Sequence, residues 1–467
     1  MNRIFNYLVL ILLLLFKACQ QPIQPFGALP SPQQVKWHEL EYYMFIHFGP
    51  NTFTNVEWGH GDEDPNVFNP SNLDARQWAA TAKAAGMKGI IITAKHHDGF
   101  CLWPSKYSSH TVRESAWKNG EGDVLKELAE ACAEYGLFMG VYLSPWDRNH
   151  PHYGTRQYNQ TFVNMLEEVL SNYGPITEVW FDGANGEGPN GKLQVYDWDL
   201  FNNTVYQYQP DAIIFSDGGP GCRWVGNENG FAGLTNWATL NADKVFPGYP
   251  DYHELTEGHE DGTHWVPAEC DVSIRPGWFY SPDTDDQVKS LEQLREIYFA
   301  SIGRGANLLL NIPVDRRGLI HAADSARLME LKGEIDKIFS NRMGTPSSIN
   351  SSASLRNYPA ENLLDENLNT LWAAKQNESW IELVYDEAIA FNILVLKEGI
   401  AHGQRIKSFA VDIWQEGSYH EIDKQSTIGY KRILEFDESF ETTKIRIRIL
   451  ESKAPAVLAE IAVYRND

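Results

Sequence analysis

Short apolar runs alternate with amphipathic helical stretches between about residue 30 and residue 340. The runs with strand character end in polar or aromatic residues, and they lie at 42–49, 89–98, 138–147, 178–184, 212–219, 264–273 and 306–315. Apolar positions spaced as in a helix fill intervening segments such as 74–86, 124–136, 156–173 and 287–303. Because strands separated by helices pair in parallel through crossover connections, this alternation predicts an α/β fold.

The number of repeats distinguishes two parallel α/β architectures. Seven or eight strand–helix units favour a closed (β/α)8 barrel of the TIM type over an open doubly wound sheet. The pattern G-x-G-x-x-G, which marks a dinucleotide site in open sheets, does not follow the first apolar run. We therefore predict a barrel over residues 30–342.

The composition changes near residues 340–353, where Gly, Pro and Ser accumulate as in a linker. Beyond it, apolar and polar residues alternate with period two in runs such as WIELVYD, FNILVLKE and TKIRIRIL. This alternation predicts a small all-β sandwich over residues 350–467. The stretch ENLLDENLNTLWAA (361–374) resembles the start of discoidin-like, coagulation-factor-C-type carbohydrate-binding modules. The resemblance implies either a glycan-binding module or a structural buttress for the barrel.

The first residues, MNRIFNYLVLILLLLFKAC, combine a basic Arg3 with an apolar run from Tyr7 to Phe16. That run is shorter than a transmembrane helix requires, and it is typical of an export signal. Cys19 follows directly, as in a bacterial lipoprotein signal, although Phe16 and Lys17 depart from the usual small or aliphatic residues. We expect residues 1–19 to be the export signal of a periplasmic or outer-membrane lipoprotein, with ordinary secretion as the alternative.

Charge and cysteine content exclude several kinds of partner. The 39 basic against 62 acidic residues give a net charge of −23, which argues against nucleic acid and against an anionic membrane surface. Membrane contact would therefore come only from a lipid anchor at Cys19. The other four cysteines lie far apart without a CxxC pair, so we expect no zinc site, and no motif indicates a cofactor.

Polar residues gather at the ends of the predicted strands: His47, His96, His97, Asp98, Trp146, Asp147, Asp182, Asp217 and Asp271. In a TIM barrel the C-terminal ends of all strands meet on the face that holds the active site. A single Asp at a strand end often only caps the next turn. Several polar strand ends on one face instead predict a catalytic site.

The residue types at these ends favour a pair of carboxylates over other chemistries. His96 and His97 are adjacent and would point to opposite faces of a strand, so they do not form a zinc pair. No G-x-S-x-G element offers a serine nucleophile. Glycoside hydrolysis needs one carboxylate at the reacting carbon and a second group that carries a proton. Asp182, in EVWFDGANG, is the nucleophile candidate. Spacing leaves three acids open: Glu57, Glu228 and Glu269.

Six segments follow one another along the predicted barrel: MFIHFGPNTFTNVEW, AKHHDGFCLWPSKYS, EVWFDGANG, RWVGNENG, RPGWFY and NLLLNIPVDRRG. Together they resemble the α-L-fucosidases of glycoside hydrolase family 29. The resemblance implies a retaining exo-α-L-fucosidase in which Asp182 is the nucleophile and Glu228 the acid/base. It also implies contacts to the fucose ring from His47, Glu57, Trp58, His96, His97, Tyr142, Trp180, Arg223 and Trp278.

The GNENG setting of Glu228 resembles the second subfamily, which acts on α-1,3- and α-1,4-linked fucose in branched glycans of the Lewis type. The partner would then be a fucosylated oligosaccharide or glycoconjugate. Fucose also fits the residue types, because its hydroxyls need donors and acceptors and its methyl group needs an apolar wall such as Trp. Three alternatives stay open: the broad-specificity subfamily, a related glycosidase acting on galactose, and a catalytically silent glycan-binding lipoprotein.

Overall fold

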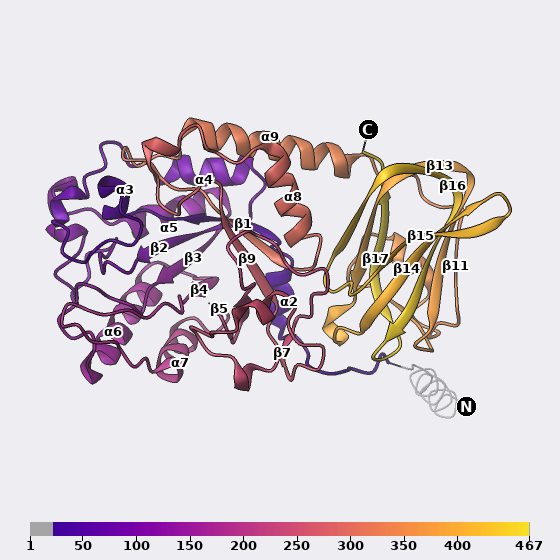
Figure 1. Cartoon of the computed structure of the whole chain (residues 1–467), viewed down its shortest axis with the longest axis horizontal. Helices are drawn as coiled ribbons and strands as arrows, with labels where there is room; N and C mark the ends of the chain where they lie inside the picture. Colours follow the sequence, from indigo (N-terminus) through magenta and orange to yellow (C-terminus); the bar gives the residue numbers. More distant parts are fainter. Residues whose placement is uncertain (1–21, 467) are drawn as a thin grey trace, which may run out of the picture. The chain divides into compact units, whose positions relative to one another are not determined.

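We describe residues 22–466 from a computed structural model of the chain (Figure 1). They divide into two compact units. One is Pro30–Lys337, and the other combines residues 22–29 with the chain from Ile338 onward. No helix in this described range is long and apolar enough to cross a membrane. The expected export signal and Cys19 lie outside the described residues.

The first unit contains a closed barrel of eight parallel strands, which confirms the predicted fold. The strands are β1 (Tyr42–Ile46), β2 (Gly89–Lys95), β3 (Phe138–Leu143), β4 (Glu178–Trp180), β5 (Ile213–Ser216), β6 (Cys222–Trp224), β9 (Ala268–Ser273) and β10 (Asn307–Asn311). Around the barrel β1 pairs with both β2 and β10, which closes the sheet. Their residues are almost all buried, because a barrel strand packs against side chains on both faces.

Helices surround these strands in Figure 1. They are α2 (Pro32–His38), α3 (Pro50–Thr54), α4 (Ala75–Ala84), α5 (Val124–Tyr135), α6 (Arg156–Asn172), α7 (Trp198–Tyr208), α8 (Leu291–Ser301) and α9 (Ala322–Ser340). Local sequence explains where they begin: Asp74 caps α4 by accepting two backbone N–H bonds, and Ser290 forms a capping box at α8. The four segments with helical spacing correspond to α4, α5, α6 and α8.

Strands β5 and β6 depart from the strand–helix repeat. Only residues 217–221 connect them, yet they pair in parallel with Phe215 opposite Cys222. Gly221 passes so close to β5 that a Cβ there would lie 2.5 Å from the backbone nitrogen of Ile214. A three-residue strand without a following helix leaves little periodic signal, which is why the pattern did not predict β6. The predicted run 264–273 likewise divides into β8 (His264–Trp265), paired with β7 (Thr239–Leu240), and the barrel strand β9.

The second unit is an antiparallel all-β domain, as predicted. Its strands are β11 (Ser348–Ser351), β12 (Trp372–Ala373), β13 (Ser379–Glu398), β14 (Ile406–Gln415), β15 (Ser418–Gln425), β16 (Arg432–Ser452) and β17 (Val457–Tyr464). The two runs expected within 380–398 form one long strand, β13, whose register shifts between Val384 and Ile389 and again between Phe391 and Ile393. Such irregularities bend a strand, so one strand gives two separate alternating patterns.

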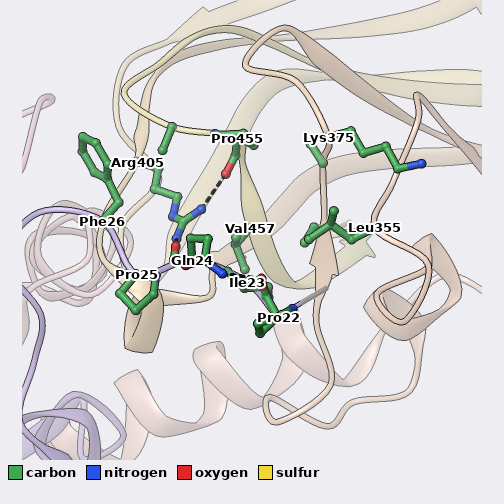
Figure 2. A pocket seen from close by; sticks show the side chains of 13 residues that line it. Pro22, Ile23, Gln24, Pro25, Phe26, Leu355, Lys375, Arg405, Pro455 and Val457 are labelled. Atoms are coloured by element: carbon green, nitrogen blue, oxygen red, sulfur yellow. Dashed lines mark hydrogen bonds between the residues drawn. The ribbon is translucent and has the colours of Figure 1, made fainter. Parts of the chain in front are cut away.

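Residues 22–29 belong to this all-β unit, a grouping that the sequence did not suggest. Ile23 is buried with Leu371 and Val457, and the guanidinium of Arg405 donates hydrogen bonds to the carbonyls of Gln24 and Pro455 (Figure 2). These residues border a cavity of about 480 Å³. The segment that precedes the barrel is therefore held against the C-terminal domain by both apolar packing and hydrogen bonds.

Candidate active site

A cavity of about 200 Å³ lies at the C-terminal ends of the barrel strands, and we call it the strand-end cavity. Its lining comes from β1, β3, β4 and β9 and from the loops that follow the strands. The lining residues are Phe45, His47, Trp58, His96, His97, Tyr142, Trp180, Asp182, Ala184, Glu228, Asp271 and Trp278. Parallel strands bring their C-terminal ends to one face, so residues far apart in the chain meet here.

Asp182 follows β4 by two residues and is held at both carboxylate oxygens. The hydroxyl of Tyr142 donates a 3.0 Å hydrogen bond to Oδ2, and the N–H of Ala184 donates one of 2.7 Å to Oδ1. Nε2 of His97 lies 3.7 Å from Oδ2. The Asp182 side chain remains 28% exposed. The carboxylate is therefore fixed in orientation and still accessible from the cavity.

Glu228 lies on a tight loop after β6. The flanking Gly226 and Gly230 both have φ near +80°, a conformation that strains other residues. Asn227 braces the loop, since its Oδ1 accepts the N–H of Asn229. Partial burial raises the pKa of the Glu228 carboxyl, a hydrogen bond with Trp278 lowers it, and nearby Asp182 raises it. A carboxyl with a raised pKa near a second, accessible carboxylate is the arrangement that a general acid needs.

Three histidines face the cavity in neutral form. His96 and His97 both do so, contrary to the expectation that they point to opposite faces, because β2 ends at Lys95 and the two residues follow the strand. Burial lowers the pKa of His47 to about 3 and that of His97 to about 4, and it lowers the pKa of His96 well below its usual value. Nδ1 of His47 lies 2.9 Å from Oδ1 of Asn311, whose amide nitrogen already donates two hydrogen bonds. Nδ1 of His47 therefore carries the hydrogen and Nε2 is an acceptor. Neutral rings of this kind suit hydroxyl groups rather than anions.

Aromatic rings form the rest of the wall. Trp180 stacks on Phe215 with ring centres 3.8 Å apart, and its ring centre lies 5.3 Å from that of Tyr142. Trp58 is 52% exposed and packs edge-on against His97. Flat apolar surfaces beside neutral hydrogen-bonding groups are suited to a sugar ring that carries a methyl substituent.

Nine of the eleven site residues expected from the sequence line this cavity, and Glu57 and Arg223 do not. The Glu57 carboxylate accepts the backbone N–H of Trp278. Burial raises the pKa of Glu57, while its backbone hydrogen bonds lower it. Glu57 therefore holds the backbone of the lining residue Trp278, and the charge of Glu228 also raises its pKa.

Arg223 is wholly buried, and the expected sugar contact is replaced by a structural role. Its guanidinium donates to the carbonyls of Leu255 and Val266 and to Oδ1 of Asn236. Buried carbonyl groups need donors, and these bonds tie β6 to the segment 236–266. The motif RWVGNENG puts Arg223 close to Glu228 in the sequence. The direction of the Arg223 side chain, however, depends on its hydrogen bonds to the segment 236–266.

Glu228 and Glu269, two of the candidates for the catalytic acid, differ in their burial. Glu269 is fully buried in β9 and lies outside the cavity lining. Asp271, two residues further along β9, does line the cavity and accepts the indole N–H of Trp224. Burial holds the pKa of the Asp271 carboxyl well above its usual range, and the charge of Glu228 adds to this. The sequence marked Asp271 as a polar strand end without giving it a role.

Comparisons with known proteins agree with this geometry. The Alpha-L-fucosidase family profile matches residues 30–333, and the F5/8 type C domain profile matches residues 348–461. Alpha-L-fucosidase 1 of Arabidopsis thaliana is 41% identical over 95% of this chain and 88% of its own length.

Solved structures extend the likeness to the fold. The crystal structure of SpGH29 has a TM-score of 0.90 and 39% identity, covering 96% of this chain and 100% of that one. A GH29 fucosidase of Ruminococcus gnavus in complex with fucose has a TM-score of 0.87 and 31% identity, covering 96% and 97%. The chain therefore belongs to the α-L-fucosidases of glycoside hydrolase family 29, with an F5/8 type C domain at its C-terminal end.

Proposed function

We propose that the enzyme is a retaining exo-α-L-fucosidase in which Asp182 is the nucleophile and Glu228 the acid/base. The observation that carries this proposal is the presence of both carboxyls on one small cavity, where Asp182 is held by Tyr142 and Ala184 and burial raises the pKa of Glu228. Retention requires two such groups on either side of the glycosidic bond.

The reaction proceeds in two displacements. Asp182 attacks C1 of the fucose from the face opposite the leaving oxygen, while Glu228 gives its proton to that oxygen and the C–O bond breaks. The fucose is then an ester of Asp182. Glu228, now a carboxylate, takes a proton from water, and the water oxygen displaces Asp182 from C1.

The neutral histidines and the aromatic wall bind the fucose ring in this proposal. His47 offers an acceptor at Nε2, and Trp180, Trp278 and Trp58 offer apolar surface to the methyl group. The R. gnavus relative was solved in complex with fucose, which supports the same ligand here. An enzyme that prefers galactose would need room and a partner for a hydroxyl on C6.

We further propose that the natural substrates carry α-1,3- or α-1,4-linked fucose on a branched, Lewis-type glycan. The support is the GNENG loop, which places Glu228 on a short, braced turn. Purified enzyme should be tested on trisaccharides with 1,2, 1,3, 1,4 and 1,6 linkages beside an aryl fucoside. Branched 1,3 and 1,4 substrates should be cleaved about 10- to 100-fold faster than their disaccharide fragments, since two further hydrogen bonds act on the transition state.

Three other outcomes of the same screen have distinct meanings. Comparable rates on 1,2- and 1,3/1,4-linked substrates would favour the broad-specificity alternative. Cleavage of galactosides alone would point to the related glycosidase. Binding without turnover of any substrate would leave the silent glycan-binding protein.

Export as a lipoprotein is a separate proposal that rests on the first 19 residues alone. Metabolic labelling with a fatty acid in a bacterial host tests it. Label that is lost in Cys19→Ser would support the anchor, and an unlabelled secreted protein would leave ordinary secretion.

A further inference from the structure

Two carboxyl groups lie deep in the barrel interior, outside the strand-end cavity and without a role in the reaction above. Glu178 begins β4 and Glu269 lies in β9, and both are fully buried. No lysine or arginine of the described residues forms an ion pair with either of them. Two ionised carboxylates in such a position would repel each other without compensation.

The hydrogen bonds around Glu178 and Glu269 indicate how many protons the two carboxyls hold. The indole of Trp37 donates a 2.8 Å hydrogen bond to Oε2 of Glu178, and the indole of Trp180 donates one of 2.8 Å to Oε1 of Glu269. The Tyr43 hydroxyl contacts both carboxyls, closely at Oε2 of Glu269 and at 3.4 Å from Oε2 of Glu178. A hydroxyl has one proton, so it can donate to only one of them.

One additional proton resolves this arrangement. If Glu269 is protonated at Oε2, it donates to the Tyr43 oxygen, and Tyr43 donates to Glu178. Both Tyr43 contacts are then hydrogen bonds, and the pair carries a single negative charge. The two carboxyls also form a hydrogen bond with each other, which lowers the pKa of Glu178 and raises that of Glu269, so the proton lies between the two carboxyls as well as beside Tyr43. Burial raises the pKa of both carboxyls, and the charge of Glu178 raises that of Glu269 further, in agreement with this assignment.

A bound metal ion is the competing explanation, because Cys222 lies with Glu178 and Glu269 and offers a third ligand atom within 4.8 Å. The indole N–H groups of Trp37 and Trp180 argue against it, since they donate to Oε2 of Glu178 and Oε1 of Glu269 and would face a cation bound between the two carboxylates. Of the four carboxylate oxygens, Oε1 of Glu178 has no hydrogen-bond partner. Burial also raises the pKa of the Cys222 thiol well above its usual value, which favours the thiol over the thiolate that binds metals.

The pair reaches the strand-end cavity through Trp180. Its indole N–H is held by Glu269, while its ring stacks on Phe215 and lines the cavity. Tyr142, which lies against the same ring, donates to Asp182. The orientation of Trp180 therefore sets both the wall of the cavity and the surface against which Tyr142 packs.

We propose that Glu178 and Glu269 share one proton, beside the Tyr43 hydroxyl that contacts both, and act together as positioning residues that fix Trp180 in the wall of the strand-end cavity. The proposal relies on the proposed function only for the identity of the ligand. Neither carboxyl touches the sugar, and their effect on binding passes through the Trp180 indole.

Binding of L-fucose to the full chain, measured by calorimetry, tests the positioning role without depending on turnover. Glu269→Leu removes the hydrogen bond to the indole and should weaken binding about tenfold. Trp180→Phe removes the same hydrogen bond together with part of the ring that lines the cavity, so it should weaken binding by at least as much. The double variant should be no weaker than the weaker single variant, because the two changes break one interaction. Glu269→Gln keeps an acceptor for the indole, and it should restore affinity to within about threefold of the unmodified enzyme.

Glu168→Leu is the matched control. Glu168 accepts the indole N–H of buried Trp103 at 3.0 Å, and neither residue lines the strand-end cavity. This variant should lower thermal stability while leaving the affinity for L-fucose unchanged. Additive effects of Glu269→Leu and Trp180→Phe, or an unaltered affinity in Glu269→Leu, would overturn the positioning role.

The shared proton has its own readout in the dependence of Tm on pH. Carboxyls whose pKa is raised on folding stabilise the protein at low pH, and this stabilisation is lost as pH rises through the raised pKa. The unmodified protein should therefore lose more thermal stability between pH 5 and pH 8 than Glu269→Gln, which needs no proton at that position. Superimposable profiles, or a stoichiometric metal ion in the purified protein, would refute proton sharing.

These measurements separate the two proposals. If the unmodified enzyme bound no L-fucose, the proposed function would fail, while the pH profiles would still decide on the carboxyl pair. If Glu269→Leu did not fold, Glu269→Gln and Trp180→Phe would remain. A loss of more than tenfold in the affinity of Glu269→Gln would then contradict a protonated Glu269.

Discussion

Glu228 and Asp182 differ in the surroundings of their carboxyl groups. Asp182 is held by two donors, whereas Glu228 lies partly buried on its glycine-flanked loop with a raised pKa. Glu228→Ala should therefore spare aryl fucosides, whose leaving group departs without protonation, and reduce turnover of natural glycans by about 100-fold or more. Comparison of kcat/KM on the two substrate types measures this, and equal losses would move the acid role to another group.

In the proposed mechanism Glu228 also determines how kcat/KM depends on pH. Glu228 must be protonated to act as acid, so kcat/KM on a natural glycan should fall as pH rises through its pKa, and the raised pKa moves that fall toward neutral pH. In Glu228→Gln the alkaline fall should disappear from the pH–rate profile. A profile with an unchanged alkaline limb would show that another group titrates there.

Asp271 also lines the cavity and interacts with Glu228, but it is fully buried whereas Glu228 is only partly buried. Burial holds the pKa of the Asp271 carboxyl well above its usual range, which favours its neutral form. Asp271→Asn resembles that neutral form and should lower kcat/KM on both substrate types by less than about tenfold. A selective loss on natural glycans alone would instead identify Asp271 as the proton donor.

At the scale of elements, the sequence predicted the strands and helices that follow the repeating pattern, and it did not predict those that depart from it. Short apolar runs located seven of the barrel strands, and helical spacing located α4, α5, α6 and α8. β6 lacks a crossover helix, and β13 bends through register shifts, so neither gives the expected pattern. The motifs identified most of the cavity lining. Glu57 and Arg223 are exceptions because their directions depend on partners far along the chain, at Trp278 and in the segment 236–266.

The segment 22–29 is an element that no periodicity could reveal, because its order depends on Arg405 and on apolar contacts with the all-β domain. Arg405→Ala removes the donor to Gln24 and Pro455 and should speed proteolytic cleavage before residue 30 several-fold. Lys375→Ala is the control, since this exposed residue borders the same cavity. Equal cleavage rates in Arg405→Ala and Lys375→Ala would show that packing alone holds the segment.

At the scale of the whole molecule, the residues of the candidate active site and the all-β domain lie in different units. Every residue that lines the strand-end cavity lies between Phe45 and Trp278, within the barrel unit. Arg405→Ala should therefore keep kcat on an aryl fucoside within about twofold of the unmodified enzyme, even if its N-terminal segment is cleaved faster. A large fall in kcat would show that the all-β unit contributes to catalysis.

The central claim is that Asp182 forms the covalent bond to fucose. A 2-fluoro-fucosyl fluoride slows the second displacement, so the account predicts a stable adduct of one fluorofucosyl group per chain by mass spectrometry, located on the peptide that contains Asp182. Asp182→Ala should form no adduct and lose about 10³-fold or more in turnover of an aryl fucoside. An adduct on another residue, such as Asp271, or release of fucose with inverted configuration, would contradict the account.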